Sequence, residues 1–235
     1  MEISKALNRH IQIDQHPIPT LDILIDKLQG GQFYSKIDLA DAYLQIELDD
    51  EAKKLCVINT PFGLFQYNRM CFGLASSPAQ FQRLMDTLIA GLPGVAAYLD
   101  DLIITGSTEK EHWENIERLV ERLSEYGLRV KLDKSVFFQN SVEYLGFIID
   151  KDGKRPSKLS IEAVKQLKKP ENVAEVQAFL GKINYYRSFF KNLAEIANPL
   201  YQLLKKHCVF DWTLQCENAI QVLKNEIVNA TKLSH

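Results

Sequence analysis

The stretch V-A-A-Y-L-D-D-L-I-I-T, from Val95 to Thr105, has two carboxylates at its centre and apolar residues on both sides of them. Its length and pattern predict a β-hairpin that turns at Asp100 and Asp101. Two-residue hairpin turns favour Asn-Gly or Asp-Gly, because both central positions need a positive φ, and adjacent carboxylates repel each other. A bound divalent cation such as Mg²⁺ would neutralise the pair. A solvated acidic turn is the alternative for this dipeptide taken alone.

Asp38 adds a third carboxylate. It lies within Y-S-K-I-D-L, residues 34–39, which reads as an otherwise buried strand, and aspartate is disfavoured in strands. Three carboxylates on two strands could hold two metal ions about 4 Å apart, the arrangement used for phosphoryl transfer. Such crowding should also raise the pKa of at least one of the acids. The alternative for Asp38 is a strand-end residue that caps the next segment.

The 235 residues are 46% apolar and 25% charged, proportions typical of a soluble globular protein. No run of about 18 apolar residues is present, so no membrane partner is expected, and the polar N-terminus predicts no secretory signal. The four cysteines lack zinc-site spacing and are interpreted as reduced thiols. Residues 1–127 hold 11 Lys or Arg against 19 Asp or Glu, whereas residues 128–235 hold 17 against 11. This asymmetry is typical of a metal-binding module beside a nucleic-acid-binding one, or of two solvated surfaces.

Hydrophobic periods predict mixed helices and strands up to about residue 150 and only helices beyond it. We therefore expect an α+β unit over residues 1–149 and an all-α unit over residues 150–235. A serine of the pair at 76–77 should cap one helix, and Thr108 with Glu111 should form a capping box at another. The expected strands are 33–48 with a turn at 41–43, 56–60, 63–67, 128–132, 136–139 and 143–149, and the expected helices are 17–28, 76–91, 108–127, 159–167, 173–190, 196–204 and 214–228.

Five linked segments carry a more specific signal than any of these residues alone. They are FYSKIDLADAYLQIEL (33–48), NTPFGLFQYNRMCFGLASSPAQFQRLMD (59–86), AAYLDDLIITG (96–106), LRVKLDKSVFFQNSVEYLGFIID (128–150) and FLGKINYYRSFFKNLAEIANPLYQLL (179–204). In this order the segments are similar to those of long-terminal-repeat retrotransposon polymerases, and the whole chain resembles a reverse transcriptase of the Ty3/gypsy type. The resemblance implies an α+β polymerase palm with partial fingers on an antiparallel sheet over residues 1–149, followed by an all-α thumb and the start of a connecting segment over residues 150–235.

The resemblance also implies roles for the acids. Asp38 matches the first catalytic aspartate of the family, and Asp100 and Asp101 match the pair in its YxDD hairpin. Together with the backbone carbonyl of Leu39 they would bind two Mg²⁺ ions, or Mn²⁺ in their place. One ion would lower the pKa of the primer 3′-hydroxyl, and the other would orient the triphosphate.

A nucleotide pocket is implied by the same comparison. Tyr43 matches the steric gate that leaves no room for a 2′-hydroxyl, with a core aromatic as the alternative. Phe72 and Gly73 match the segment that lines the pocket, where Cys71 replaces the usual Pro of the family. Lys134 matches a lysine that approaches the triphosphate, with an ordinary surface lysine as the alternative.

Primer and duplex contacts are implied further along the chain. Tyr144, Leu145 and Gly146 match the primer grip, a tight hairpin that holds the primer 3′-end, and the glycine permits close backbone approach. Tyr185 and Tyr186 are expected to pack in the core rather than to stack on bases. Basic residues of the helical unit would contact duplex phosphates, although any one of them could be a solvated side chain. They are Lys154, Arg155, Lys158, Lys165, Lys182 and Arg187, with Lys168, Lys169 and Lys191 as further candidates.

The expected function is RNA-directed and DNA-directed DNA polymerisation in retrotransposon replication. Such a nucleotidyltransferase uses an RNA or DNA template with a primer, and deoxynucleoside triphosphates. A catalytically weak or domesticated remnant that only binds nucleic acid is the alternative. The family's fingers segment ahead of Ala6-Leu7-Asn8 is missing from these residues, as are its RNase H and integrase domains, so the chain alone is expected to bind duplex but to extend it poorly. The protein is expected in the cytoplasm, with virus-like particles and the nucleus as alternative locations, and it is not expected to be secreted. The sequence predicts no particular oligomeric state.

Overall fold

The computed structural model describes residues 5–12, 14–206 and 209–230. Contacts within the chain divide it into two compact units, which we call unit 1 (Met1–Val142) and unit 2 (Glu143–His235). The boundary predicted after residue 149 lies a few residues further along the chain than this division.

Unit 1 is built on a four-stranded antiparallel sheet with the strand order β4-β5-β1-β6. The central strand β1 (Phe33–Leu39) pairs with β5 (Asp101–Gly106) on one side and with β6 (Val130–Gln139) on the other. The edge strand β4 (Val95–Tyr98) pairs with β5. The prediction of an α+β fold on an antiparallel sheet is confirmed.

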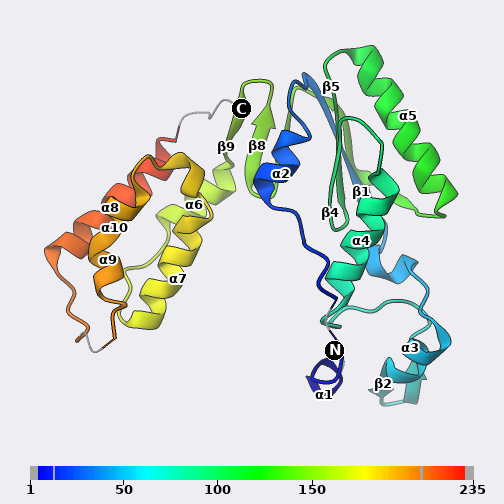
Figure 1. The fold of residues 1–235 in the computed structure, drawn as a ribbon, viewed down its shortest axis with the longest axis horizontal. Coiled ribbons are helices and arrows are strands. Elements are labelled where there is room, and N and C mark those ends of the chain that lie inside the picture. The colour runs from blue at the N-terminus through cyan, green and yellow to red at the C-terminus, as the bar shows by residue number, and fades with distance from the viewer. Residues whose placement is uncertain (1–4, 13, 207–208, 231–235) are drawn as a thin grey trace. The chain divides into compact units, whose positions relative to one another are not determined.

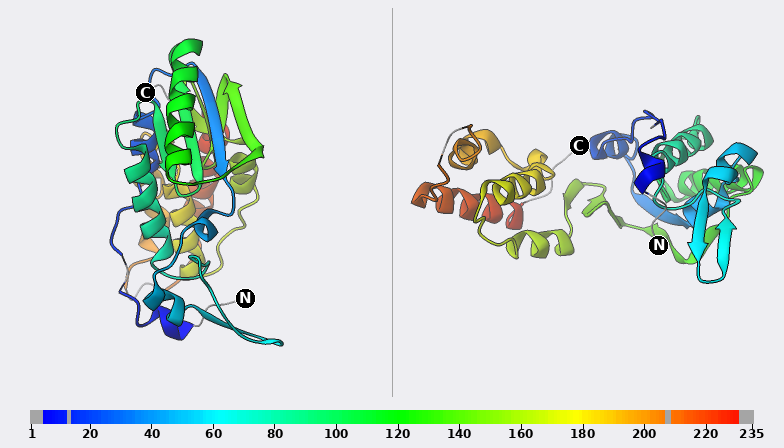
Figure 2. Two further views of the ribbon diagram at one scale, coloured as in Figure 1. Left: turned by 90° about the vertical axis from the view of Figure 1, so that its right-hand side faces the viewer. Right: turned by 90° about the horizontal axis from the view of Figure 1, so that it is seen from below.

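Helices α4 (Ser77–Ile89) and α5 (Glu109–Glu125) lie across one face of this sheet (Figures 1 and 2). Alternate strand residues point toward the helices, as a pleated sheet requires, and meet their apolar faces in the main core. A buried polar pair also joins the layers, because Ser35 Oγ of β1 lies 2.7 Å from Nε2 of His112 on α5. The principal core residues are Ile37, Leu39, Phe81, Met85, Leu88, Leu102, Ile104, Ile116, Leu119 and Leu123.

Helix α5 begins as predicted. Thr108 Oγ1 accepts a hydrogen bond from the backbone N–H of Glu111 at 3.2 Å, and the Glu111 carboxylate accepts one from the N–H of Ser107 at 2.8 Å. Helix α4 differs, because Ser76 at its cap position has a helical backbone and makes no side-chain capping bond. The capping box is therefore confirmed and the serine cap of α4 is wrong. Gly91, with a φ of 78°, follows the end of α4 as predicted.

The hairpin of β4 and β5 turns one residue earlier than predicted. Tyr98 pairs with Asp101, so the two turn residues are Leu99 and Asp100, and Asp101 is the first residue of β5. Leu99 takes a φ of 53°, a left-handed conformation that is uncommon for a bulky residue. The apolar runs on both sides of the acids suit either register, so the sequence pattern could not choose between them.

The segment after β1 is not the continued strand that alternation predicted. Asp41 and Ala42 take positive φ values of 57° and 34°, which end the strand and begin the 3₁₀ helix η1 (Ala42–Gln45). The turn predicted at 41–43 is confirmed. Helix α3 (Asp50–Leu55), which no pattern predicted, is capped by Asp49, whose carboxylate accepts the N–H of Ala52 at 2.7 Å.

The predicted hairpin of β2 (Val57–Thr60) and β3 (Gly63–Gln66) is confirmed, and it projects from the rest of unit 1 (Figure 2). Its apolar side chains Phe62, Leu64 and Phe65 are 90%, 73% and 53% exposed. This hairpin therefore contributes little to the core. The remaining elements of unit 1 are α1 (Lys5–Asn8) and α2 (Leu21–Asp26), the latter shorter than the predicted helix 17–28.

Unit 2 contains most of a three-stranded sheet with the order β7-β8-β9. Its strands are β7 (Ser141–Tyr144), β8 (Phe147–Asp150) and β9 (Gly153–Pro156). The predicted strand 143–149 is thus broken by a turn, and β9 was not predicted. The two strands predicted at 128–132 and 136–139 are instead one irregular strand, β6, whose pairing with β1 shifts register twice.

Helices make up the rest of unit 2, as predicted. The helix expected at 173–190 ends at Asn184. The helix expected at 196–204 is shorter, at 198–202, and a separate helix at 193–196 precedes it. The helix predicted at 214–228 is confirmed at both ends. The elements are α6 (Lys158–Lys165), α7 (Val173–Asn184), the 3₁₀ helix η2 (Arg187–Phe189), α8 (Leu193–Ile196), α9 (Asn198–Gln202) and α10 (Leu214–Val228).

Cys56, Cys71 and Cys216 are buried free thiols, and Cys208 lies outside the described residues. Within the ranges that the structure describes, no helix has both the length and the apolar character needed to cross a membrane.

Candidate active site

Strand pairing brings the three predicted acids to one end of the sheet. In the register of β1 and β5, Asp38 lies directly opposite Asp101. Asp100 occupies the turn just before β5, and its carbonyl accepts a hydrogen bond from the N–H of Leu39 at 3.2 Å. All three acids are partly exposed. A carboxylate-rich end of the sheet, open to solvent, is the result.

A lysine lies among these acids. Lys36 precedes Asp38 by two residues on β1, so the two side chains leave the same face of the strand. Its Nζ lies 2.9 Å from each carboxylate oxygen of Asp101. Burial raises the pKa of Asp101 above its ordinary value, Lys36 opposes that rise, and Asp100 and Asp38 add to it. The predicted rise in the pKa of one acid is confirmed in direction, although burial rather than repulsion is its main cause.

The donor atoms of this site suit a hard divalent cation, because Mg²⁺ and Mn²⁺ prefer carboxylate and carbonyl oxygens. Among the residues that the structure describes, no group of three or more His, Cys, Asp or Glu side chains is already arranged around a metal position. The ammonium of Lys36 instead supplies a positive charge at Asp101. The oxygen donors of the site thus suit a divalent cation, and in the metal-free protein the ammonium of Lys36 partly balances their negative charge.

Gln82 of α4 supports the acidic turn, and sequence reasoning did not single it out. Its side chain is fully buried. Oε1 accepts the N–H of Leu99 at 2.8 Å, while Nε2 lies 3.1 Å from both the Ala97 carbonyl and the Asp86 carboxylate. A left-handed conformation costs a residue such as Leu99 on the order of 1–3 kcal/mol, and these bonds hold it there.

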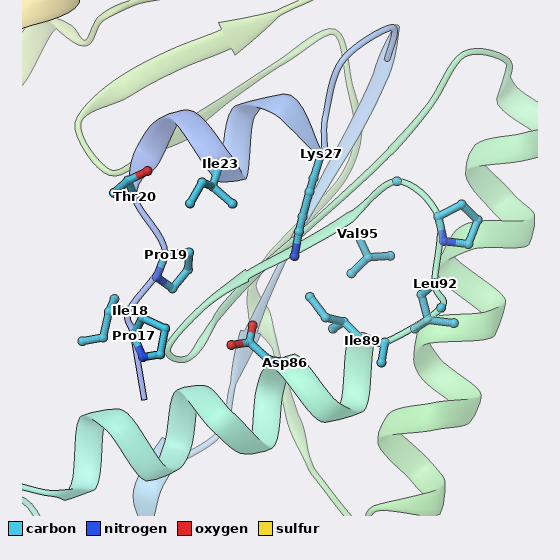
Figure 3. A pocket seen from close by; sticks show the side chains of 14 residues that line it. Pro17, Ile18, Pro19, Thr20, Ile23, Lys27, Asp86, Ile89, Leu92 and Val95 are labelled. Carbon is cyan, nitrogen blue, oxygen red and sulfur yellow. The ribbon is translucent and has the colours of Figure 1, made fainter. Parts of the chain in front are cut away.

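Asp86 connects Gln82 to the N-terminal segment, because its second oxygen lies 2.7 Å from Nε2 of His16. Asp86 also lines a pocket of about 670 Å³ between residues 17–20, α2 and the end of α4 (Figure 3). Apolar side chains form most of this pocket, and none of the predicted site residues lines it.

Tyr43, the predicted steric gate, lies on η1 and packs between two aromatic rings. Its ring centroid is 5.3 Å from that of Phe72 and 5.1 Å, edge-on, from that of Phe81. Burial raises the pKa of Tyr43, and the negative charge of Asp100 adds to the rise. The structure therefore brings Tyr43 and Phe72, two of the predicted nucleotide-pocket residues, into contact near the acids.

Gly73, the neighbour of Phe72, has a φ of 93° and open space where a Cβ would lie. Asn8 holds this segment in place, since its Nδ2 donates to the Gly73 carbonyl at 2.8 Å and its Oδ1 accepts the N–H of Ala75 at 2.9 Å. This clamp was missed, because no local pattern links the first helix to residues so far along the chain.

Strand β6 supplies further contacts to Asp38. Ser135 Oγ accepts the N–H of Asp38 at 3.3 Å, and Lys131 lies opposite Asp38 in the strand register. The ammonium of Lys131 pairs with Asp41 at 3.7 Å. Lys134 is exposed on the same strand, and its predicted approach to the triphosphate stays a prediction. Lys131 was missed because only the irregular β1–β6 register places it there.

The predicted primer-grip hairpin is a two-residue turn between β7 and β8. Leu145 and Gly146 have φ values of 48° and 76°, the pair of positive angles that a type I′ turn requires. Tyr185 donates its hydroxyl to the Leu145 carbonyl at 2.6 Å, and Ser160 donates to the Gly146 carbonyl at 2.7 Å. A Cβ at Gly146 would lie 2.7 Å from Ser160 Oγ, and Tyr144 is fully buried. The tight hairpin is confirmed, and its contact with a primer stays a prediction.

Aromatic packing holds this hairpin against the following helices. The Phe147 ring centroid lies 5.3 Å from that of Tyr185 and 5.6 Å from that of Tyr186. Tyr186 is buried, which confirms its predicted place in the core, whereas Tyr185 is 49% exposed.

The predicted phosphate-binding residues of unit 2 differ in availability. Lys154 is buried. Arg155 pairs with Asp150 at 3.9 Å, and Lys165 pairs with Glu162 at 2.7 Å. Burial or pairing makes these three less available to a phosphate than an exposed, unpaired lysine, and the phosphate contacts of the whole set stay predictions. The exposed members of the set are Lys158, Lys165, Lys168, Lys169, Lys182, Arg187 and Lys191. Of these, Lys169 is also paired, because its Nζ lies 3.8 Å from the Glu217 carboxylate and 5.1 Å from the centre of the Trp212 ring.

Residues 2–149 match the family model described as reverse transcriptase (RNA-dependent DNA polymerase), and the chain belongs to this family. Several of its relatives are transposon Pol polyproteins of the Ty3/gypsy type. The chain is 35% identical over 227 residues to the retrovirus-related Pol polyprotein from transposon 297 of Drosophila melanogaster. These 227 residues are 95% of this chain and 21% of the relative. It is 32% identical over 235 residues to the transposon Tf2-3 polyprotein of Schizosaccharomyces pombe, covering 98% of this chain and 18% of the relative.

An uncharacterized protein of Caenorhabditis elegans is 46% identical over 180 residues, which is 77% of this chain and 14% of the relative. The chain thus spans between 14% and 21% of the length of these three relatives. Among solved structures, a foamy viral protease-reverse transcriptase in complex with double-stranded DNA matches 98% of this chain and 41% of its own, with a TM-score of 0.89 at 24% identity. At that identity the likeness shows that the fold is shared.

Proposed function

We propose that the chain is the DNA polymerase part of a retrotransposon Pol polyprotein, which joins deoxynucleotides to a primer 3′-hydroxyl along an RNA or DNA template. One observation carries the proposal: Asp38 lies opposite Asp101 on facing strands, and the adjoining turn carries Asp100. Carboxylates gathered in this way are what metal-assisted nucleotidyl transfer needs. Membership of the reverse transcriptase family supports the same reaction.

Asp38, Asp100, Asp101 and the carbonyl of Leu39 would hold two Mg²⁺ or Mn²⁺ ions. When bound, these ions would make the primer hydroxyl more acidic and neutralise charge on the phosphates. Tyr43 would lie against the deoxyribose of the incoming nucleotide and fill the space of a 2′-hydroxyl.

Other residues complete the nucleotide pocket and the hold on the primer. Phe72 and Gly73 would line the pocket beside Tyr43, with which Phe72 is in contact. Lys134 would meet the triphosphate. The turn at Leu145 and Gly146 would hold the primer end.

A primer–template duplex is the proposed partner. The exposed basic residues of unit 2 support it, as do the foamy viral relatives in complex with double-stranded DNA and with an RNA/DNA hybrid. Phosphate contacts carry no sequence information, so duplexes of any sequence should bind. We place the reaction inside the cell, in the cytoplasm or in virus-like particles, because the relatives are transposon polyproteins.

Primer extension with Mg²⁺ tests the proposal. Asp100→Asn should abolish incorporation, because a neutral amide binds a hard cation far more weakly than a carboxylate does. Asp133→Asn, which changes an exposed acid on β6, is the matched control and should extend primers at the parent rate. Incorporation by Asp100→Asn at anything like the parent rate would contradict the metal assignment.

A nucleic-acid-binding remnant is the second candidate function. It is favoured by the ammonium of Lys36, which lies 2.9 Å from each carboxylate oxygen of Asp101, one of the proposed metal ligands. In that case the chain would bind duplex but would not extend primers with Mg²⁺ or with Mn²⁺. Duplex binding together with slow extension that Asp100→Asn abolishes indicates the polymerase, whereas duplex binding with no extension in either metal indicates the remnant.

A further inference from the structure

Lys36 engages both oxygens of Asp101. Its Nζ lies 2.9 Å from Oδ1 and 2.9 Å from Oδ2. In the β1–β5 register Lys36 is opposite Ile103, so its side chain reaches diagonally along the strands to Asp101, a span that long side chains cover. Both side chains are about three-quarters buried, with 25% and 24% of their surfaces exposed. An ammonium in this position occupies the two atoms through which the acid would bind a metal.

Lys131 provides an internal comparison. It lies opposite Asp38 in the register of β1 and β6, on the other side of β1 from Asp101. Its ammonium pairs with Asp41 at 3.7 Å, and Asp41 is not among the proposed metal ligands. Lys131 therefore adds positive charge near the acids without engaging Asp101.

An ammonium and a divalent cation cannot share the same two oxygens, because their charges repel and their positions overlap. We propose that Lys36 is a resident counter-ion, which holds Asp101 in the metal-free protein and must leave that carboxylate when a divalent cation binds. Lys36 is thereby a positioning residue that sets the affinity of the site for metal. The inference rests on the metal site of the proposed function.

The size of the effect follows from the ion pair. Because the pair exists only in the metal-free state, the free energy it contributes opposes metal binding by the same amount. Partly exposed pairs contribute at most about 1 kcal/mol, so its removal should tighten metal binding by roughly two- to five-fold. Arginine presents a planar fork that matches two carboxylate oxygens better than an ammonium does. Lys36→Met should therefore bind the divalent cation most tightly, the parent less tightly, and Lys36→Arg most weakly.

A titration of the chain with Mn²⁺ in the absence of nucleic acid measures this order of affinity. Electron paramagnetic resonance reports the concentration of free Mn²⁺ at each step of the titration. Lys131→Met is the matched control, since it removes a nearby charge without releasing Asp101, and it should tighten binding less than Lys36→Met. Thermal unfolding is the second readout. With a chelator present, Lys36→Met should unfold at a lower temperature than the parent, and the difference should vanish at saturating Mn²⁺.

The outcomes separate the inference from the proposed function. The inference alone is overturned if the parent binds Mn²⁺, Asp100→Asn abolishes that binding, and Lys36→Met binds Mn²⁺ with the affinity of the parent. Equal tightening by Lys36→Met and Lys131→Met also overturns it, because overall charge would then explain the effect. No Mn²⁺ binding by any variant, or binding that Asp100→Asn does not weaken, removes the metal site and the inference together. If Lys36→Met does not fold without metal, Lys36→Arg carries the test, and affinity equal to that of the parent counts against the inference.

Discussion

The side-chain carbonyl of Gln82 accepts the backbone N–H of Leu99 at 2.8 Å, so a buried residue of α4 fixes the turn that carries Asp100. The same amide also reaches the Ala97 carbonyl and, through Asp86, the segment that contains His16. The acidic turn is therefore positioned by the helix beneath the sheet rather than by its own residues. Its geometry should depend on Gln82 more than on any residue of the turn itself.

Gln82→Leu should destabilise the protein by about 1–3 kcal/mol, because it removes the partners of the buried Ala97 carbonyl and of the partly buried N–H of Leu99. Urea unfolding measures the change. Gln80→Leu on the same helix is the control, since Gln80 is exposed, and it should stay within about 0.5 kcal/mol of the parent. Amide exchange at Leu99 should become faster in Gln82→Leu only. Equal stability of the two variants would show that the turn does not need this support.

Tyr43→Val should raise the use of ribonucleotides relative to deoxyribonucleotides, because it opens space beside the sugar. A pocket that gains or loses a small group changes selectivity by about 10- to 200-fold in the ratio of kcat/KM values. Tyr43→Phe keeps the ring against Phe72 and Phe81 and should keep the parent ratio. Single-nucleotide incorporation with each substrate gives both ratios. If the ratio for Tyr43→Val does not move, Tyr43 is a core aromatic only.

Stability should fall with acidification through His112. Burial lowers the pKa of His112 below its ordinary value of 6.5, so the unfolded chain takes up the proton first as the pH falls. The free energy that neutral His112 contributes to stability is fully present above about pH 6.5. It is lost as the pH falls from there through the lower pKa that His112 has in the folded protein, with a slope of at most about 1.4 kcal/mol per pH unit. Urea unfolding from pH 8 to pH 5 should show this loss in the parent and not in His112→Gln. Parallel profiles would exclude His112 as the cause.

Duplex binding should weaken steeply with salt. If about five basic residues contact phosphates, the logarithm of affinity should fall against the logarithm of salt concentration with a slope of roughly −4 to −5. Replacing exposed Lys182 with Gln should reduce the slope by about 0.9. Lys53→Gln, in the small helix α3 of unit 1, should leave it unchanged. Salt-independent binding would remove the role given to the basic helices.

Local chemistry explains why parts of this fold could be predicted. The capping box at Thr108 and the helix 214–228 are specified by residues within a few positions of each other. Asp38 was recognised because an acid is out of place in an apolar strand. These signals need no knowledge of how distant segments pair.

The rest depends on register and long-range contacts. The turn of β4 and β5 lies at Leu99 and Asp100 because Tyr98 pairs with Asp101, a choice that the apolar runs leave open. Lys36 and Asp38 share a strand face by simple alternation, yet only the β1–β5 pairing brings Lys36 to Asp101. Gln82 is a polar residue among buried positions of α4, which is a usable signal, but its partner Leu99 follows from tertiary packing.

The projecting hairpin of β2 and β3 has a practical consequence for handling the protein. Phe62 and Leu64 face water and take no part in the main core, so replacing them with serine or lysine should leave the free energy of unfolding almost unchanged. Exposed apolar patches of this kind promote association between molecules. Polar substitutions at these two positions therefore offer a way to raise solubility and to slow aggregation in concentrated samples while the carboxylate site remains intact.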